Sequence, residues 1–290
     1  MKIKLAFLFA FLSVLISSQY SCAQKLIPPP VFQDNWTYDY DPFRIVGNLY
    51  YVGTYDLGCY LITTPQGNIL INTGLVESVP MIKAHIEKLG FKFTDLKILL
   101  ATHAHFDHVA GMAAIKKMTG AQLMTEEQDA AVMEDGGNSD YSFGGKGSTF
   151  PPVKPDRLLH DHDTIKLGNT RVTVLHHPGH TKGACSYLVD VKDDQRTYRV
   201  LIANMPTILD TTYPAMPTYP TVADDYAKTF DAMRKVSFDL WVASHASQFK
   251  LHSKRKPGQP YSPEVFADRP GYDKELDNLY QAYRRKFNIK

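Results

Sequence analysis

The sequence predicts one α/β domain in which two mixed β-sheets pack face to face and helices cover their outer faces. Strand-like segments fall into two groups along the chain, and each group is accompanied by amphipathic helical patterns. No internal repeat and no linker divides the chain. The 290 residues, less an expected leader of 23, leave 267, which is enough for one large hydrophobic core.

The first 23 residues have the layout of a secretory signal peptide. Lys2 and Lys4 precede an apolar run over residues 5–16, and Ser21-Cys22-Ala23 offers a small-residue cleavage site. We expect cleavage after Ala23, a mature domain over residues 24–290, and export to the periplasm. Two alternatives stay open: the apolar run acts as a membrane anchor, or Cys22 carries a lipid as in bacterial lipoproteins.

The charge balance gives no reason to expect a nucleic acid or a stable membrane partner. The chain has 32 Lys and Arg against 30 Asp and Glu, and removal of Lys2 and Lys4 with the leader makes the two counts equal at 30. We therefore expect a monomer that acts on a small molecule. Cys59 and Cys185 remain after processing, both in apolar strand patterns, and whether they pair stays open.

The first half reads as a meander followed by a helix and a buried strand. Strands are expected at 43–46, 49–52, 59–63 and 69–72, separated by Gly and Pro turns. A helix with Ser78 as N-cap has an apolar stripe of Ile82, Ile86 and Leu89 and ends at Gly90. The largely apolar segment 96–101 predicts a strand buried on both faces, and helices are expected at 109–118 and 126–133.

The second half repeats this scheme after a loop. Residues 136–152 are rich in Gly and Ser and carry Tyr141, Phe143 and Phe150, which predicts a mobile loop with aromatic contact groups. Strands are expected at 165–167, 171–176, 185–191, 198–203 and 240–243, with helices at 223–236 and 272–287. These elements complete the second sheet and its helical cover.

The segment His103-Ala104-His105-Phe106-Asp107-His108 carries the strongest functional signal. Packing alone does not require three His and one Asp within six residues directly after an apolar strand. His103 and His105 project to the same side of an extended segment, and a turn can bring Asp107 and His108 beside them. His180 and His245, each in a turn-like setting, would complete two zinc coordination shells.

Other histidines among the eleven fit structural or solvated roles better. His85 lies in a helical pattern, and His252 precedes a basic run. The rival cluster His160-Asp161-His162-Asp163 falls in a polar turn between two short strands. His176 and His177 close an apolar strand, where packing or contact with a ligand residue is expected rather than metal binding.

Ligands at strand ends and in loops indicate an open, catalytic site. A structural zinc is usually closed by four protein ligands, whereas a catalytic zinc keeps a position for water and lowers its pKa to about 7. Two adjacent ions can share that hydroxide and polarise both ends of a scissile bond. The sequence contains neither a Gly-x-Ser-x-Gly nucleophile elbow nor a phosphate-binding loop. It therefore predicts metal-dependent hydrolysis.

These motifs resemble the metallo-β-lactamase superfamily over essentially the whole mature chain. The resemblance rests on the His-x-His-x-Asp-His motif, the turn Pro178-Gly179-His180-Thr181, and His245. The stretches at 43–45, 50–54, 71–74, 177–183, 202–206 and 243–249 resemble subclass B3, and within it the branch called GOB. That branch commonly has Gln at the first ligand position, where this chain has His103.

The resemblance implies an αββα sandwich and zinc-dependent hydrolysis of the β-lactam amide bond of penicillins, cephalosporins and carbapenems, and so antibiotic resistance. It implies that one zinc ion is bound by His103, His105 and His180, and a second by Asp107, His108 and His245. Asp107 would orient a hydroxide that bridges the ions and attacks the carbonyl, while the second zinc stabilises the leaving nitrogen. The substrate-binding candidates are Thr207, Met205, Asn204 and Trp36.

One departure from the subclass concerns the substrate carboxylate. Many members hold it with serines at positions that correspond to Met205 and Thr207 of this chain. Thr207 retains a hydroxyl donor, whereas Met205 offers no donor at all.

Two other functions are weighed against this one. Glyoxalase II and the lactonases of the superfamily use an Asp that bridges both metals after a strand, but the comparable segment here is Ala203-Asn204-Met205, without a carboxylate. A secreted zinc-stabilised binding protein without activity is the other alternative. An inactive relative is expected to have lost at least one of the six ligands, and all six are present.

Overall fold

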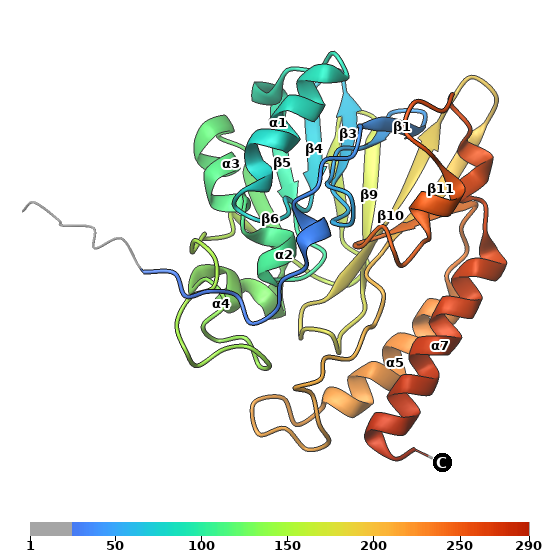
Figure 1. The fold of residues 1–290 in the computed structure, drawn as a ribbon. Coiled ribbons are helices and arrows are strands. Elements are labelled where there is room, and N and C mark those ends of the chain that lie inside the picture. Colours follow the sequence, from blue (N-terminus) through green and yellow to red (C-terminus); the bar gives the residue numbers. More distant parts are fainter. Residues whose placement is uncertain (1–24, 290) are drawn as a thin grey trace, which may run out of the picture.

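The computed structural model describes residues 25–289, and in this range two β-sheets pack face to face with helices on their outer sides (Figure 1). This arrangement confirms the predicted αββα layers. The predicted signal peptide lies outside the described residues. Among residues 25–289, none of the helices combines the length and apolar character needed to cross a membrane.

The first sheet has seven strands and changes from antiparallel to parallel pairing in its middle. The four strands between residues 43 and 71 form an antiparallel meander, and the remaining pairs are parallel. Its order is β1 (Phe43–Val46), β2 (Leu49–Tyr51), β3 (Tyr60–Thr64), β4 (Gly67–Ile71), β5 (Leu96–Leu100), β6 (Gln122–Glu126) and β7 (Arg157–Leu159).

The second sheet has five strands, three of which end at the same edge. Its order is β12 (Leu240–Ala243), β11 (Thr197–Ala203), β10 (Cys185–Lys192), β9 (Thr170–His176) and β8 (Thr164–Leu167). Both β9 and β11 run antiparallel to β10, and β12 runs parallel to β11. The segments that follow β9, β11 and β12 therefore leave the sheet together.

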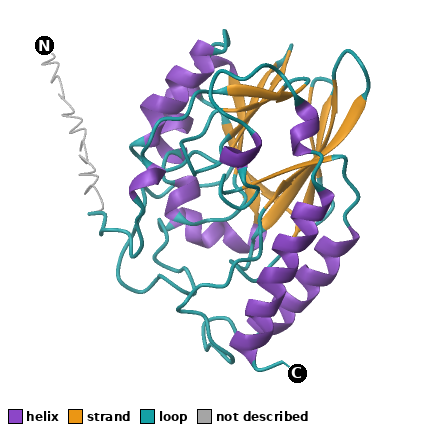
Figure 2. Cartoon of the chain, turned by 45° about the vertical axis from the view of Figure 1, so that its right-hand side comes forward, coloured by secondary structure: helices purple, strands orange, loops and turns teal. Residues whose placement is uncertain are grey.

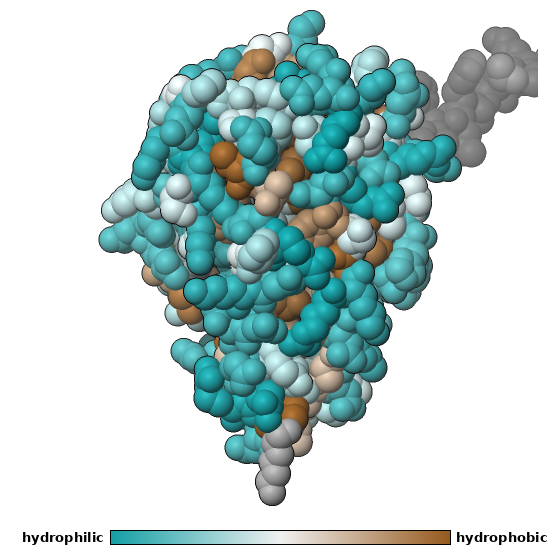
Figure 3. Space-filling view, turned by 90° about the vertical axis from the view of Figure 1, so that its right-hand side faces the viewer, coloured by the Kyte–Doolittle hydropathy of each residue, from teal (hydrophilic) through white to brown (hydrophobic). Residues whose placement is uncertain are grey.

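Helices cover the two outer faces, and long loops gather at one edge of the sheets (Figure 2). The first sheet carries α1 (Ser78–Lys88), α3 (Met112–Thr119) and α4 (Ala130–Glu134); the second carries α5 (Val222–Lys235) and α7 (Arg269–Phe287). The face of the molecule beside α7 is mainly hydrophilic, with small apolar areas scattered over it (Figure 3). The shorter helices are α2 (Phe106–Val109), α6 (Leu251–Lys254) and the 3-10 turns η1 (Asp34–Trp36), η2 (Phe93–Asp95), η3 (Glu127–Asp129) and η4 (Pro263–Phe266).

The central strands are buried on both faces, which explains their largely apolar sequences. In β5, Ile98 and Leu100 pack in the core between the sheets, while Leu99 packs under the helices of the first layer. Side chains alternate in the same way along β4. A strand covered by a second sheet on one side and by helices on the other carries apolar residues on both faces, and in β5 Lys97 near its start is the exposed exception.

Several predicted boundaries were wrong in the middle of the chain. The helix expected at 109–118 is divided into α2, which carries two metal-ligand candidates, and α3, which begins at Met112. The helix expected at 126–133 is replaced by the end of β6, by η3 and by α4. Strand β6 was not predicted, and β7 was expected only as a short strand before the polar turn at 160–163. The β6 sequence QLMTE favours a helix by propensity, but pairing with β5 and β7 outweighs that preference.

Smaller differences concern a cap, a loop and the two cysteines. Ser78 is the first helical residue rather than the N-cap, and its Oγ accepts a hydrogen bond from the Leu75 N–H at 3.1 Å. In the loop 136–152, Tyr141 and Phe150 are buried, so of its three aromatic side chains Phe143 is the one that lines the site cavity described below. Cys59 and Cys185 are unpaired and lie in different core layers.

Candidate active site

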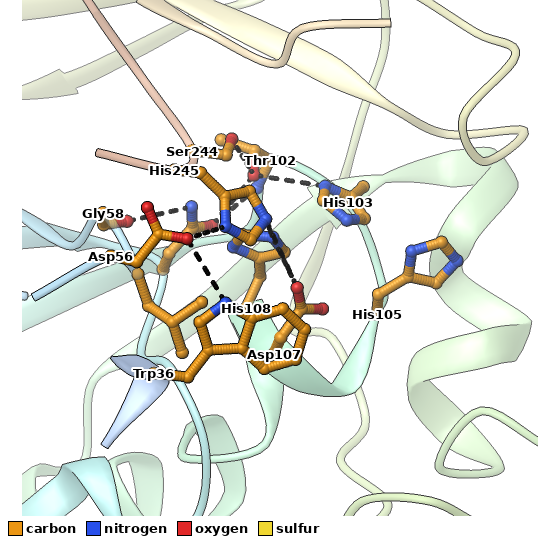
Figure 4. A network of polar contacts seen from close by, with 12 residues as sticks. Trp36, Asp56, Gly58, Thr102, His103, His105, Asp107, His108, Ser244 and His245 are labelled. Carbon is orange, nitrogen blue, oxygen red and sulfur yellow. Dashed lines mark hydrogen bonds and ion pairs between the residues drawn. The ribbon is translucent and has the colours of Figure 1, made fainter. Parts of the chain in front are cut away.

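The six predicted ligands lie together at the edge where the strands of both sheets end. Figure 4 labels His103, His105, Asp107, His108 and His245 there. His103 and His105 follow β5, and α2 carries the next two candidates of the motif. His180 lies between β9 and β10, and His245 follows β12. Two hydrogen bonds hold the sheets in register here, from Cys185 N–H to the Thr102 carbonyl at 2.8 Å and from Ser244 Oγ to Thr102 Oγ1 at 3.1 Å.

His103, His105 and His180 form a first cluster with the spacing of zinc ligands. The atoms His105 Nδ1 and His180 Nε2 are 3.2 Å apart. The ring centre of His103 lies 4.8 Å from that of His105 and 4.5 Å from that of His180. Two nitrogens bound at about 2.05 Å to one tetrahedral zinc ion would be about 3.3 Å apart. Among the described residues, the buried Nε2 of His103 has no hydrogen-bond partner, as expected for a metal ligand.

Asp107, His108 and His245 form a second cluster of the same kind. The Nε2 atoms of His108 and His245 are 3.2 Å apart, and Asp107 Oδ2 lies 3.2 Å from the first and 3.4 Å from the second. The two clusters adjoin, since the ring centres of His103 and His108 are 4.3 Å apart. The donor set therefore fits two neighbouring zinc ions.

The electrostatics of the clusters keep several donors in the form that binds a metal. Burial, with help from the neighbouring imidazoles, lowers the pKa of His180 to about 3 and holds that of His103 well below its usual range. Burial alone would raise the pKa of Asp107, but its contacts with His108 and His245 hold it well below the ordinary value. Neutral imidazoles and an ionised carboxylate are the protonation states that zinc requires.

Two other ligand candidates, His105 and His245, each contact a carboxylate through the ring nitrogen that faces away from its cluster. Burial opposes protonation of His105 and His245, but nearby carboxylates outweigh it: the pKa of His105 is raised, and that of His245 rises to about 9. Asp140 Oδ2 lies 3.3 Å from His105 Nε2, and Asp56 Oδ2 lies 3.1 Å from His245 Nδ1. Such contacts fix the orientation of a metal-binding ring and raise its basicity.

Asp56 also anchors the segments around His245. Its Oδ2 accepts from Trp36 Nε1 at 3.3 Å, and its Oδ1 accepts from the Ser247 N–H at 2.8 Å. The pKa of Asp56 is held well below its usual range because contacts with His245 and Ser247 outweigh the effect of burial. The ring of Trp36 packs 5.8 Å from that of His245.

Asp129 and Asn72 hold the backbone of the ligand segments. The Asp129 carboxylate accepts from Ala104 N–H at 2.8 Å, Thr181 Oγ1 at 2.7 Å and Gly183 N–H at 2.8 Å, so it joins the two segments of the first cluster. Asn72 adopts a left-handed backbone with φ of 60°, and its side-chain oxygen accepts from the Thr102 N–H at 3.0 Å. Sequence reasoning missed both residues, as it missed Asp56 and Asp140, because none belongs to a ligand motif.

A cavity of about 350 Å³ opens onto the two clusters. Trp36 and Thr207, two of the four substrate-binding candidates, line it. Met205 and Asn204 are buried and do not line it, and the Met205 side chain belongs to the core between the sheets. The lining consists of Val31, Gln33, Trp36, Asp56, His105, Phe106, Asp107, Phe143, His180, Thr207, Leu209, His245, Ser247 and Gln248.

Thr207 also supports a ligand. Its carbonyl oxygen lies 2.8 Å from His180 Nδ1 and accepts from the Tyr226 hydroxyl at 2.8 Å. Its own Oγ1 lies 3.0 Å from the same ring nitrogen. The side chain is therefore placed between a ligand candidate and the cavity.

The other histidines lie outside both clusters. His85 is buried between the Val52 carbonyl and Asp39, and His252 stacks on Tyr55 with ring centres 3.7 Å apart. His160 and His162 are exposed in the turn between β7 and β8. The Nε2 of His176 bonds to the Lys182 carbonyl, and the Nδ1 of His177 bonds to Ser186 Oγ.

The comparisons with known proteins agree with this geometry. Residues 59–193 match the model of the metallo-β-lactamase superfamily. The class B3 di-zinc metallo-β-lactamase LRA-12 from an Alaskan soil metagenome is 60% identical, with 90% of this chain and 99% of that chain covered and a TM-score of 0.88. The metallo-β-lactamase GOB-18 from Elizabethkingia meningoseptica is 52% identical, with 92% and 100% covered and a TM-score of 0.90.

A weaker match comes from the curated relatives. The hydroxyacylglutathione hydrolase of Rhodopseudomonas palustris strain BisB5 is 28% identical over 160 residues. This chain spans about half the length of that relative, 53%, and the match covers 54% of the chain. The near-complete coverage by the structures above, together with the paired ligand clusters, places the chain in the metallo-β-lactamase superfamily, among the class B3 metallo-β-lactamases.

Proposed function

We propose that this protein hydrolyses the amide bond of β-lactam antibiotics, namely penicillins, cephalosporins and carbapenems, and thereby confers resistance to them. One observation carries the proposal: two adjoining clusters with zinc-ligand spacing face one cavity of about 350 Å³. It is supported by 60% identity to LRA-12, described as a class B3 di-zinc metallo-β-lactamase, over almost all of that chain.

The chain's residues divide the work of this reaction. Zinc ions held by His103, His105 and His180 and by Asp107, His108 and His245 would supply a hydroxide nucleophile at neutral pH and Lewis-acid stabilisation of the leaving nitrogen. Asp107, ionised and placed between His108 and His245, would orient that nucleophile toward the substrate carbonyl. Asp56 and Asp140 hold the rings of His245 and His105 in place, so the site is oriented before the substrate arrives.

Thioester hydrolysis, as the name of the Rhodopseudomonas relative suggests, is the second candidate, and the site favours it less. The segment after β11 reads Asn204-Met205 and contributes no carboxylate between the clusters. Asn204 is buried, with its N–H bonded to Ser186 Oγ at 3.0 Å and its Oδ1 3.4 Å from Ser244 Oγ. These contacts give Asn204 a structural role.

The direct test follows hydrolysis of one penicillin, one cephalosporin, one carbapenem and one glutathione thioester by the purified mature protein. We expect cleavage of the lactams, its loss on extensive chelation, and its return when zinc is added. Undiminished lactam turnover by metal-free protein, or efficient thioester cleavage without lactam cleavage, would show that the proposal is wrong.

For substrate capture we propose Thr207 as a donor to the lactam carboxylate, with Trp36 as an apolar wall. The proton on His180 Nδ1 can be shared by the Thr207 carbonyl and hydroxyl oxygens, which leaves the hydroxyl proton free for the substrate. Met205 and Asn204 stay weaker candidates, because both are buried and neither lines the cavity.

Thr207→Val should raise KM more than it lowers kcat, since one hydrogen bond to the bound substrate is lost. The rise in KM should correspond to a loss of about 1 to 2 kcal/mol in apparent binding free energy. Steady-state kinetics with a cephalosporin measure it. Thr211→Val, in the same segment but outside the lining of the site cavity, is the matched control. Kinetics unchanged in Thr207→Val would move the search for the carboxylate-binding group to the loop 136–152.

Export to the periplasm and a monomeric state are also proposed. The support for export is the leader-like sequence of residues 1–23. Intact mass of the exported protein tests it, because cleavage after Ala23 leaves Gln24 at the N-terminus, whereas lipidation would leave a modified Cys22.

A further inference from the structure

The loop 136–152 contacts the first ligand cluster through Asp140, whose carboxylate lies beside His105. The two nitrogens of His105 face opposite ways: Nδ1 lies 3.2 Å from His180 Nε2, and Nε2 lies 3.3 Å from Asp140 Oδ2. Both carboxylate and ring are buried. A ring held from behind by a buried carboxylate loses rotational freedom, so its metal-binding nitrogen stays directed at the site.

The other oxygen of Asp140 organises the tip of the same loop. Its Oδ1 accepts from the N–H groups of Ser142 at 2.9 Å and Phe143 at 2.6 Å, and its carbonyl accepts from Gly144 N–H at 3.0 Å. Phe143 lines the site cavity, and its ring centre lies 5.2 Å from that of His105. One carboxylate thus contacts both a zinc-ligand candidate and the turn that presents an aromatic wall to the cavity.

The next residue extends the contact to a second ligand of the same cluster. The Tyr141 hydroxyl bonds to the Gly179 carbonyl, directly before His180, at 3.1 Å, and lies 3.0 Å from Thr212 Oγ1. The second cluster is supported from elsewhere, because Asp56 near the start of β3 contacts His245. The loop is therefore built against the first cluster in particular.

We propose that Asp140 is a positioning residue that couples the zinc affinity of the first cluster to the conformation of the turn 140–144, and so to the place of Phe143 in the cavity. Coupling of this kind is reciprocal: a first zinc that is bound orders the turn, and a turn ordered by substrate tightens the first zinc. The proposal rests on the zinc-binding part of the proposed function and not on the identity of the substrate.

Asp140→Asn tests it with readouts that do not depend on catalysis. The amide keeps an oxygen for the turn but removes the charge behind His105, so we expect a loss of about 10- to 100-fold in first-site zinc affinity, measured by competition with a chelator. The second site should change less. Hydrogen exchange at the amides of Ser142 and Phe143 should slow when zinc binds to the wild type and respond much less in the variant.

Asn138→Ala is the matched control. Its Oδ1 accepts from Gly147 N–H at 2.8 Å, so the change loosens the loop without touching a ligand candidate. It should speed exchange in the loop while zinc affinity falls far less than in Asp140→Asn. Asp140→Glu retains the charge and should restore part of the affinity, and it replaces Asp140→Asn if that variant does not fold.

Two results would overturn the proposal. One is first-site affinity within twofold of wild type in folded Asp140→Asn. The other is lower affinity while zinc still slows exchange at Ser142 and Phe143 as in the wild type, which would leave Asp140 a ligand support without coupling to the turn. If the protein fails to hydrolyse lactams, zinc affinity and hydrogen exchange can still be measured. A failure of the proposed function can therefore be told apart from a failure of the proposed coupling.

Discussion

At the scale of single residues, the ligand set depends on side chains that the metal motif does not contain. His105, His180 and His245 each have one nitrogen facing the other ligands and the second held by Asp140, Thr207 or Asp56. These contacts decide which nitrogen is free for a metal ion. His103 differs, because its Nδ1 has only a long contact of 3.5 Å with Thr102 Oγ1, and its position depends on the backbone that Asn72 holds.

His103→Gln tests the first cluster directly. An amide oxygen is a weaker zinc ligand than an imidazole, so we expect loss of zinc mainly from the first site, with the second retained by Asp107, His108 and His245. Metal analysis after dialysis against a weak chelator measures the stoichiometry. Two tightly retained zinc ions in the variant would contradict the assignment of His103.

His177 predicts a pH dependence of stability that is independent of the ligands. Burial lowers its pKa from 6.5 to about 4. Ser186 Oγ accepts from Asn204 N–H and can donate its own proton to His177 Nδ1, so protonation of that nitrogen would break the contact. The unfolded chain binds the proton more readily than the folded one, so stability is full above about pH 6.5 and falls as the pH drops toward 4.

The loss attributable to His177 is at most about 3 kcal/mol, the equivalent of the difference between the two pKa values. His177→Asn keeps an acceptor for Ser186 and cannot titrate, so its stability should fall less steeply. Urea unfolding of both metal-free proteins between about pH 4 and about pH 7 measures the difference. Parallel curves would show that His177 is not the titrating group.

At the scale of elements, the short turn η3 matters more for the site than its length suggests. Asp129 stands at the N-cap position of α4, yet its carboxylate makes no cap bond and instead accepts three donors from the segments that carry His103, His105 and His180. The end of β6 and the turn after it therefore act as a clamp between two ligand segments.

Asp129→Asn should weaken this clamp, because an amide nitrogen would face a donor that then lacks an acceptor. We expect a loss of about 1 to 3 kcal/mol in stability together with weaker zinc binding at the first cluster. Glu134→Gln, an exposed change on α4, is the control. Thermal unfolding and zinc competition are measured on both proteins, and equal behaviour of the two variants would exclude the clamp.

At the scale of the whole molecule, the site joins the two sheets. Its ligands follow β5 in the first sheet and β9 and β12 in the second, and hydrogen bonds from Cys185 and Ser244 to Thr102 cross between the sheets at the same edge. A metal ion bound there cross-links both layers in the native state and finds no such site in the unfolded chain.

Zinc should therefore stabilise the domain as one unit. With free zinc at about 100 times the dissociation constant, we expect about 2.7 kcal/mol of added stability and a single transition at higher temperature. Calorimetry of metal-free and zinc-loaded protein checks this, with His103→Gln expected to show a smaller gain. Two separate transitions, or an unchanged Tm, would show that the metal does not join the layers.

The sequence by itself determined the fold class and the six ligand candidates. Apolar strands buried on both faces and helices with one apolar stripe have distinct periods, and the motif at 103–108 packs four donors into one short segment. These signals are local, so they can be read without knowing what lies across the fold. Strand β6 lacked such a signal, since pairing with β5 and β7 outweighed its local preference for a helix.

Only the tertiary structure decided which residues support the ligands. Asp56, Asn72, Asp129 and Asp140 lie 189, 30, 25 and 35 positions from the groups they hold, at His245, Thr102, Ala104 and His105. It also placed Cys59 and Cys185 in separate layers, and it buried Met205 and Asn204 outside the lining of the cavity. Contacts over such separations depend on how the sheets pack, and no local pattern records them.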